Sequence, residues 1–340
     1  MRLLLSLAAG WISLANAFSA WRPRATGGQS LLRMSDIEQK CDWSWLNDVY
    51  LITTTVSQSR LERTKEELTE VGLWDRVQVR TFQPDDEDRV RGCYTSHIKV
   101  LEEVQKKFSR LEDYRVLVLE DNLERTLRMD PSVISAVGDF TENERSWDVF
   151  HLAYMMYVPG LSFVKLPSEK NVVQMLSDPS SSVGTSAYVV SKSGVNAILQ
   201  NHKKTGYVEA IPNVMARLFP STRYAAYPMV FHRAAKVGSL VNPQLDDFRR
   251  IMFSPFMYTT WERLMIATGL QNNQLFPTLA ISLFIATGAG IYGAVTGSSE
   301  GGVPAGLLLA FPLLVAIWGA TLFTPGASGA GFAKKRATSS

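Results

Sequence analysis

The sequence is poor in the residues that thiol-rich and zinc sites require. Its 340 residues include two cysteines, Cys41 and Cys93, and four histidines. Two cysteines cannot build a disulfide framework or a cysteine-rich zinc site, so we expect two buried or reduced thiols, with a single bridge as the alternative. His151, His202 and His232 show no H-x3-H spacing and no pairing with cysteine, which gives no reason to expect zinc.

The sequence also lacks an excess of charge of one sign. The net charge is +3, and basic and acidic residues alternate in segments such as RLERTKEELTE. This pattern excludes the basic stripe of a nucleic-acid-binding protein. The Gly-rich phosphate loops G-x-x-x-x-G-K-[ST] and G-x-G-x-x-G and the nucleophile motif G-x-S-x-G are absent as well.

Both ends of the chain differ in composition from its middle. Residues 1–17, MRLLLSLAAGWISLANA, combine an Arg, an apolar run and small residues in the manner of a cleaved signal peptide; a signal anchor is the alternative. Residues 18–35 begin with Phe and contain several Arg but no acid until Asp36. This transit-like composition resembles the second part of a plastid presequence, and a plain basic linker is the alternative.

Two uncharged apolar segments lie near the other end, at residues 276–295 and 303–323. Each has about the ~20 residues that a membrane-spanning helix needs, and TGSSEGG between them predicts a tight turn. We expect a two-helix transmembrane hairpin followed by a basic tail, 324–340, with a buried soluble hairpin as the alternative. Basic residues flank both outer ends, which favours a globular domain on the cytoplasm-like side: the stromal face of a plastid membrane, or an endoplasmic reticulum or Golgi membrane as the alternative.

Between these ends, residues 36–260 alternate strand-like and helix-like patterns. We expect strands over 48–55, 76–82, 114–120, 147–154 and 185–191, and helices over 60–71, 96–108 and 192–200. Strands separated by helices predict an α/β fold with a mostly parallel sheet. The continuously apolar strand VLVL is expected to be buried on both faces.

Acidic residues follow this apolar strand directly, at Glu120 and Asp121. In open α/β sheets ligands bind beyond the carboxyl ends of the strands. Acids placed there can hold a hard divalent cation that bridges a diphosphate and takes up leaving-group charge. Alone the segment is a weak sign, because acids after a strand are more often loop or helix-cap residues.

Five segments follow one another in the order VYLITTTVSQSRLER, Gly92–His97, VLVLEDN, WDVFHLA and GTSAYVVSKSGVNAIL. In this order they resemble glycosyltransferase family 25, which includes bacterial lipooligosaccharide transferases and animal procollagen galactosyltransferases, and the resemblance spans roughly residues 48–240. The resemblance implies a GT-A-like nucleotide-sugar-binding domain, a UDP- or CMP-sugar donor and a divalent cation, often manganese. Together with the expected transmembrane hairpin, it predicts a membrane-anchored hexosyltransferase with a glycan, protein or lipid acceptor.

The resemblance also assigns roles to individual residues of this sequence. It implies a metal site at Glu120 and Asp121, and catalytic or acceptor-side roles for Asp148, His97 and Asp121. It implies donor-binding roles for Arg60, Arg63, Ser96, Gly184 and Tyr188. Ser96 is also expected as the N-cap of its helix, where anionic groups bind well.

Three positions depart from the family pattern. Asn122 and Asn213 stand where acids are expected, and Thr53 stands where Asn is usual. Each lost carboxylate removes both a charge and an oxygen ligand from a hard-cation site. Two hypotheses therefore remain: a membrane-anchored glycosyltransferase, and a non-catalytic membrane-bound binding or scaffold domain on the same fold.

Overall fold

The structure is a computed structural model that describes residues 40–126, 129–144, 146–155, 161–169, 171–176, 183–227, 229–234 and 261. The expected signal peptide, transit-like segment, transmembrane hairpin and basic tail lie outside these residues and stay predictions. Among the described residues, no helix is both long enough and apolar enough to cross a membrane.

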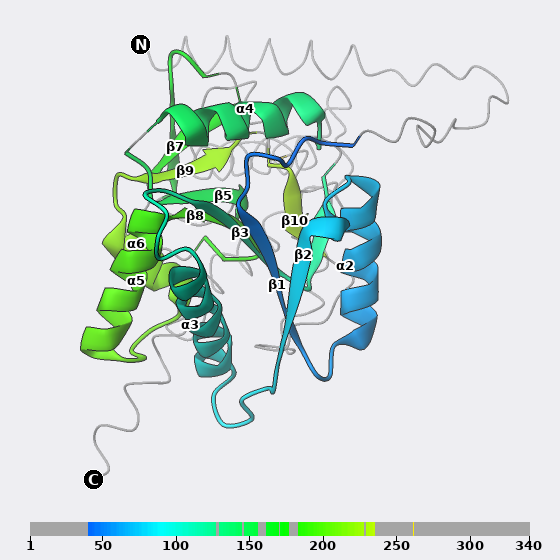
Figure 1. Cartoon of the computed structure of the whole chain (residues 1–340), viewed down its shortest axis with the longest axis vertical. Helices are drawn as coiled ribbons and strands as arrows, with labels where there is room; N and C mark the ends of the chain where they lie inside the picture. The colour runs from blue at the N-terminus through cyan, green and yellow to red at the C-terminus, as the bar shows by residue number, and fades with distance from the viewer. Residues whose placement is uncertain are drawn as a thin grey trace, which may run out of the picture.

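Eight strands form one central sheet in the order β2-β1-β3-β8-β5-β9-β7-β6 (Figure 1). The strands are β1 (Asp48–Thr54), β2 (Val77–Phe82), β3 (Arg115–Glu120), β5 (Val149–Ala153), β6 (Ser162–Lys165), β7 (Val172–Leu176), β8 (Ala187–Ser191) and β9 (Arg223–Ala226). The pairs β1–β2, β1–β3 and β5–β9 are parallel, and the other four pairs are antiparallel. All strands except β7 and β8 therefore run in one direction. The expected mostly parallel sheet is confirmed in strand direction, although β7 and β8 make it mixed.

Helices cover both faces of this sheet and complete a three-layer arrangement (Figure 1). One face packs against α2 (Gln58–Glu70) and α4 (Pro131–Asn143), and the 3-10 turn η1 (Trp74–Arg76) lies on the same side. The other face packs against α3 (Arg89–Lys107), α5 (Lys192–Thr205) and α6 (Ile211–Leu218). The α/β fold class is thereby confirmed.

The alternation of side chains along β3 shows why this strand lies in the middle of the sheet. Val116 and Val118 pack into the core beneath α3, whereas Leu117 and Leu119 pack into the core beneath α2 and α4. All four are fully buried. Burying each such side chain stabilises the fold by about 1.5–3 kcal/mol. The acidic residues that follow are therefore held at a fixed place on the sheet edge.

Helix α3 begins earlier than the sequence pattern predicted. Asp88 is its N-cap, and the Asp88 carboxylate accepts hydrogen bonds of 3.0 Å from the backbone N–H groups of Val90 and Arg91. The predicted N-cap, Ser96, instead lies within the helix, where its hydroxyl donates to the Gly92 carbonyl at 2.8 Å. The N-cap role predicted for Ser96 is wrong because the helix extends about two turns further toward the N-terminus, where Asp88, at the end of an acidic loop, caps it.

A small second sheet lies beside the main one. It pairs β4 (Leu123–Arg125) with β10 (Phe231–Arg233) in antiparallel register. The backbone N–H of Ala234 then donates to the carbonyl of Asn122 at 2.7 Å. This ladder brings the chain around Arg233 next to the acidic segment at the end of β3.

Candidate functional site

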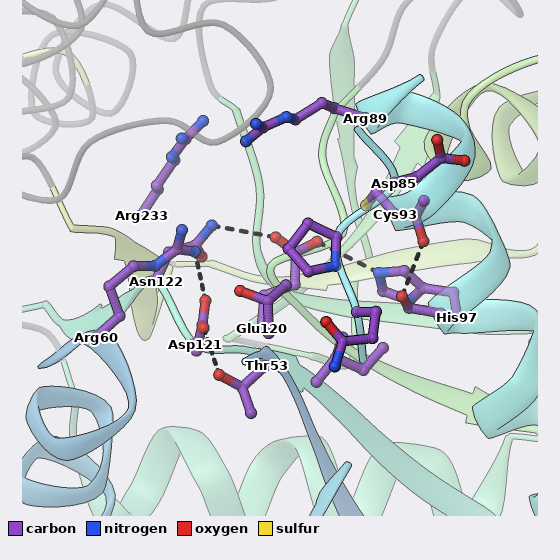
Figure 2. Close-up of a pocket in the computed structure, with 16 residues that line it drawn as sticks. Thr53, Arg60, Asp85, Arg89, Cys93, His97, Glu120, Asp121, Asn122 and Arg233 are labelled. Atoms are coloured by element: carbon purple, nitrogen blue, oxygen red, sulfur yellow. Dashed lines mark hydrogen bonds and ion pairs between the residues drawn. The ribbon is translucent and has the colours of Figure 1, made fainter. Parts of the chain in front are cut away.

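A pocket opens at the carboxyl ends of β1 and β3, where ligand sites of α/β sheets are found. It encloses about 770 Å³ including its open mouth. Thr53, Glu120 and Asp121 come from the strand ends, Arg60 comes from α2, and the first half of α3 forms the opposite wall (Figure 2). The remaining lining residues are Ile52, Thr54, Gln83, Pro84, Asp85, Arg89, Gly92, Cys93, Ser96, His97, Asn122 and Arg233.

Asp121 is a buried carboxylate with a partner on each oxygen. Its Oδ2 accepts a 2.7 Å hydrogen bond from the Thr53 hydroxyl, and its Oδ1 forms an ion pair with Arg60. Burial raises the pKa of Asp121 above its usual range, although Arg60 and Thr53 oppose that shift. The Thr53 side chain thus fills the place of the expected Asn and donates a hydrogen bond there.

Glu120 is held in position by three neighbours. Its Oε1 accepts a 2.9 Å hydrogen bond from the Thr185 hydroxyl and lies 3.4 Å from His97 Nε2, while Oε2 accepts a 3.1 Å bond from the amide of Asn122. Burial alone would raise the pKa of Glu120, but His97, Thr185 and the charge of Arg233 outweigh it and lower the pKa to about 2. Glu120 is therefore ionised at neutral pH and is a weak base.

His97 lies on the inner face of α3 and is completely buried. Its Nδ1 is 3.0 Å from the hydroxyl of Tyr188, and the two rings stack with centroids 5.8 Å apart. The pKa of Tyr188 is raised well above its usual range by burial and by the charge of Glu120, so its hydroxyl stays protonated. Tyr188 fixes the orientation of the imidazole, and Nε2 consequently points toward Glu120.

Three arginines reach this pocket from different elements: Arg60 from α2, Arg89 from the start of α3, and Arg233 from the end of β10. Arg60 is paired with Asp121, and Arg89 lies 3.7 Å from the exposed Asp86. Within the part of the chain that the structure describes, Arg233 forms no ion pair. In Figure 2 the side chains of Arg89 and Arg233 lie on the same side of Glu120.

The structure brings together most of the predicted site residues. Arg60, Ser96, His97, Glu120 and Asp121 all line the pocket. Tyr188 stands directly behind His97. The grouping of the strand-end acids with the Ser-His segment therefore agrees with what the resemblance implied, while the roles of these residues stay predictions.

Besides Tyr188, three further predicted residues do not line this pocket. Asp148 precedes β5 and so lies at the amino end of that strand, away from the pocket. There its carboxylate accepts 2.5 Å hydrogen bonds from the hydroxyls of Ser193 and Thr222. Arg63 forms an ion pair with Glu124. Gly184 has a φ of 84° and precedes β8. The geometry gives Asp148 no access to a ligand in this pocket, and we leave it out of the proposed machinery.

Sequence reasoning missed Cys93, Thr185 and Arg233. Cys93 and His97 are four residues apart on α3, and this helical spacing was a signal that could have been found, because it places both side chains on one face. Thr185 and Arg233 gave no such signal, since their places depend on the antiparallel pairing of β8 with β3 and of β10 with β4. Asn213 lies within α6 and does not line the pocket, so the acid missing there does not affect this site.

The residues present do not suit a manganese ion held by Glu120 and Asp121. A hard cation needs several free oxygen ligands. Both Asp121 oxygens already have partners, and the guanidinium of Arg60 balances its charge. Glu120 Oε2 accepts from Asn122, where a third acid was expected. The side chains that could share a metal ion with Glu120 are instead the softer ligands Cys93 and His97.

No protein-family model matches this chain, and no curated protein does. Among solved structures, it is similar to a glycosyltransferase involved in glycosylation of the major capsid of PBCV-1, with a TM-score of 0.36, 10% identity, and coverage of 61% of this chain and 98% of that one.

UDP-glucose pyrophosphorylase is also among the similar structures. The complex with UDP-glucose has a TM-score of 0.31 at 9% identity, and the apo form has 0.31 at 10%; each covers 53% of this chain and 72% of the other. The neighbours are thus glycosyltransferase and nucleotide-sugar pyrophosphorylase folds. These values are too low to assign a family or an activity.

Proposed function

We propose that the pocket binds the diphosphate or phosphate of a UDP- or CMP-sugar, and that the protein is a membrane-anchored glycosyltransferase that moves a hexosyl group to a hydroxyl acceptor. The observation that carries the proposal is the guanidinium of Arg233, which has no ion-pair partner among the described residues and lines a pocket at the carboxyl edge of the sheet. A guanidinium that has no ion-pair partner among the described residues and lies in such a place favours an anionic ligand.

Arginine suits a phosphate better than a simple positive charge does. Its planar guanidinium can donate two parallel hydrogen bonds to two phosphate oxygens. Arg233 and Arg89 would bind the phosphates on one side of the pocket. The anionic Glu120 repels phosphate, so the sugar would lie toward Glu120 and His97.

The transfer step requires a base and a site for the leaving group. The acceptor oxygen attacks the anomeric carbon, the bond from that carbon to the phosphate oxygen breaks, and the electron pair leaves with the phosphate. The arginines would stabilise this negative charge. Asp121 is a better base than Glu120, because burial raises its pKa whereas the pKa of Glu120 is about 2. A phosphate that drew Arg60 away would free Asp121 Oδ1 for this role.

The alternative proposal is a non-catalytic binding domain on the same fold. It is favoured by the partners that occupy both oxygens of Asp121 and by the amide at Asn122. Both proposals predict ligand binding at Arg233, and only the enzyme transfers or hydrolyses the sugar.

Titration calorimetry of the purified full chain with UDP, CMP, UDP-glucose and UDP-galactose tests the proposal. We expect Arg233→Gln to weaken binding about 10- to 100-fold, as expected for a lost charge-assisted hydrogen bond. Arg110→Gln is the matched control, because Arg110 is exposed and does not line the pocket. Absence of binding for every nucleotide, or equal affinity in the two variants, would refute nucleotide-sugar binding.

Turnover and location need separate measurements. Release of hexose or transfer to an added acceptor, lost in Asp121→Asn, supports the enzyme; binding without either reaction supports the binding domain. The proposed location is a plastid membrane with the domain facing the stroma. A fluorescent reporter fused to residues 1–45 tests it, and a reticular or Golgi signal alone would reject the plastid.

A further inference from the structure

Three side chains that the transfer mechanism does not require as a unit meet in the wall of the pocket. Cys93 and His97 lie one helical turn apart on α3, and Glu120 ends β3 opposite them (Figure 2). One ligand atom of each, the thiol sulfur, an imidazole nitrogen and a carboxylate oxygen, lies within 4.8 Å of the other two.

The imidazole of His97 is oriented as in a metal ligand. Its Nδ1 is engaged by the Tyr188 hydroxyl at 3.0 Å, which leaves Nε2 for a second partner. Nε2 is completely buried, has no hydrogen bond within the described part of the chain, and lies 3.4 Å from Glu120 Oε1. A buried nitrogen without a hydrogen bond is costly, and metal-binding histidines are generally fixed through their other ring nitrogen in this way.

We propose that Cys93 Sγ, His97 Nε2 and Glu120 Oε1 bind one Zn²⁺ ion, with the fourth coordination position open to the pocket. The spacing suits tetrahedral zinc. With Zn–N and Zn–O bonds of about 2.1 Å, the edge of the tetrahedron between nitrogen and oxygen is about 3.4 Å. The sulfur must approach by a small movement of the Cys93 side chain, which is only half-buried.

The chemistry of the three ligands favours zinc over a hard cation. Thiolate and imidazole select zinc among the common divalent ions, whereas manganese prefers oxygen. Formation of the Zn–S bond displaces the thiol proton to solvent, and the resulting thiolate and the Glu120 carboxylate together neutralise the ion. The positive charge of Arg233, which lines the same pocket, repels a bound cation. The same charge also stabilises the thiolate and lowers the pKa of Cys93, which burial and the charge of Glu120 otherwise raise.

The neighbours of Glu120 provide support for a bound ion. Thr185 donates to Oε1 and Asn122 donates to Oε2, so the carboxylate keeps its orientation with or without metal. Three protein ligands with an open fourth position are typical of catalytic rather than structural zinc. The inference stands on these side chains and does not depend on the nucleotide-sugar proposal.

Cobalt substitution of the purified full chain tests the site directly. Cys93 coordination predicts a thiolate-to-Co²⁺ charge-transfer band and one equivalent of Zn²⁺ or Co²⁺ retained per chain after gel filtration. Both should be lost in Cys93→Ser and in His97→Gln. Cys41→Ser is the matched control, because Cys41 lies in the core beneath α2 and α4, and it should keep both signals.

Thiol counting supplies a second measurement, which does not require a variant of the buried His97 to fold. The chain has two cysteines, so accessible-thiol titration in denaturant gives a fixed total. In the folded protein, Zn²⁺ should slow modification of Cys93 at least tenfold in wild-type and Cys41→Ser chains. Retention of metal in Cys93→Ser equal to wild type, or no protection of Cys93 by Zn²⁺, would overturn the inference.

Discussion

A methyl group on Gly92 would lie 2.8 Å from the Cβ of Asp85 and 3.2 Å from the Asp85 backbone nitrogen. Helix α3 and the acidic loop before it touch at this point, and both line the pocket. Because the atoms in contact belong to backbone and Cβ, a side chain at position 92 cannot be accommodated by a rotamer change. The absence of a side chain therefore determines how close the loop lies to the helix.

Gly92→Ala should destabilise the protein by about 1–2 kcal/mol and displace the loop. Alanine would ordinarily gain about 1 kcal/mol in a helix, but the overpacking costs about 1–3 kcal/mol and outweighs it. Urea unfolding measures the loss, and nucleotide affinity should fall with it. Glu102→Ala, at an exposed position of the same helix, should change stability by less than about 0.5 kcal/mol. Equal stabilities in the two variants would contradict the contact.

The Arg60–Asp121 ion pair should behave as a buried pair. The two side chains are 15% and 4% exposed. Arg60→Met leaves a buried carboxylate without its cation and should cost roughly 2–3 kcal/mol. Adding Asp121→Asn to that variant should recover about 1–2 kcal/mol, as measured by a double-mutant cycle in urea.

Arg63→Met is the comparison for this pair. Arg63 lies on α2 like Arg60 and forms an ion pair with Glu124 of β4, but the Arg63 side chain is 34% exposed. More exposed ion pairs contribute only about 0–1 kcal/mol. A cost in Arg63→Met as large as in Arg60→Met would show that burial does not distinguish the two pairs.

His151 should make the protein less stable in mild acid. It is fully buried in β5, and neither ring nitrogen has a hydrogen-bond partner among the described residues. Burial, with a smaller effect of Arg223, lowers its pKa to about 3. In the unfolded chain its pKa is about 6.5, so between these values the unfolded state binds more protons and stability falls as the pH falls. The loss should reach roughly 2 kcal/mol at pH 5.

Urea unfolding of wild type and His151→Leu between pH 8 and pH 5 measures this effect. The leucine variant should lack the part of the pH dependence that begins below about 6.5. His202→Leu is the control, because His202 lies near the exposed end of α5 and Nδ1 is 3.0 Å from the Tyr94 hydroxyl. Identical pH slopes in wild type and His151→Leu would mean that His151 is not held neutral in the fold.

Asn122→Asp tests whether the stability of the protein requires an amide at this position. The Asn122 side chain is buried and its amide donates to Glu120. An aspartate would replace that donor with a third carboxylate beside two others, so we expect a loss of roughly 1–3 kcal/mol at pH 7. Asn143→Asp, at the exposed end of α4, should change stability by less than about 0.5 kcal/mol. Wild-type stability in Asn122→Asp would show that the pocket tolerates a third acid without metal.

The parts of the fold that could be predicted are those with long apolar patterns. The strands at β1 and β3 were found because their residues are buried on both faces, and α5 was found from its helical spacing. The short strands β4, β6, β7, β9 and β10, and the helices α4 and α6, were missed. In β9 the pattern is interrupted by Arg223, which is fully buried and whose guanidinium donates to the Phe219 carbonyl. From the sequence alone, an arginine is expected to be exposed, so Arg223 gives no sign of a buried strand.

The site could be predicted only where its residues follow a strand directly. Glu120 and Asp121 were expected at a sheet edge because β3 was recognised. Asp148 has the same kind of neighbours in sequence, but it precedes its strand, and the parallel direction of β3 and β5 places it at the opposite edge. Arg233 is at the pocket because β10 pairs with β4, a relationship that no local pattern reveals.

The pairing of the pocket residues with distant parts of the chain has a consequence for folding kinetics. Thr53 and Asp121 are 68 positions apart, Glu120 and Thr185 are 65 apart, and His97 and Tyr188 are 91 apart. Contacts of this separation close large loops and form slowly, so no contiguous fragment can assemble the site in advance of the sheet. A ligand that binds here would recognise only chains whose sheet is complete, and would therefore stabilise the whole fold against unfolding.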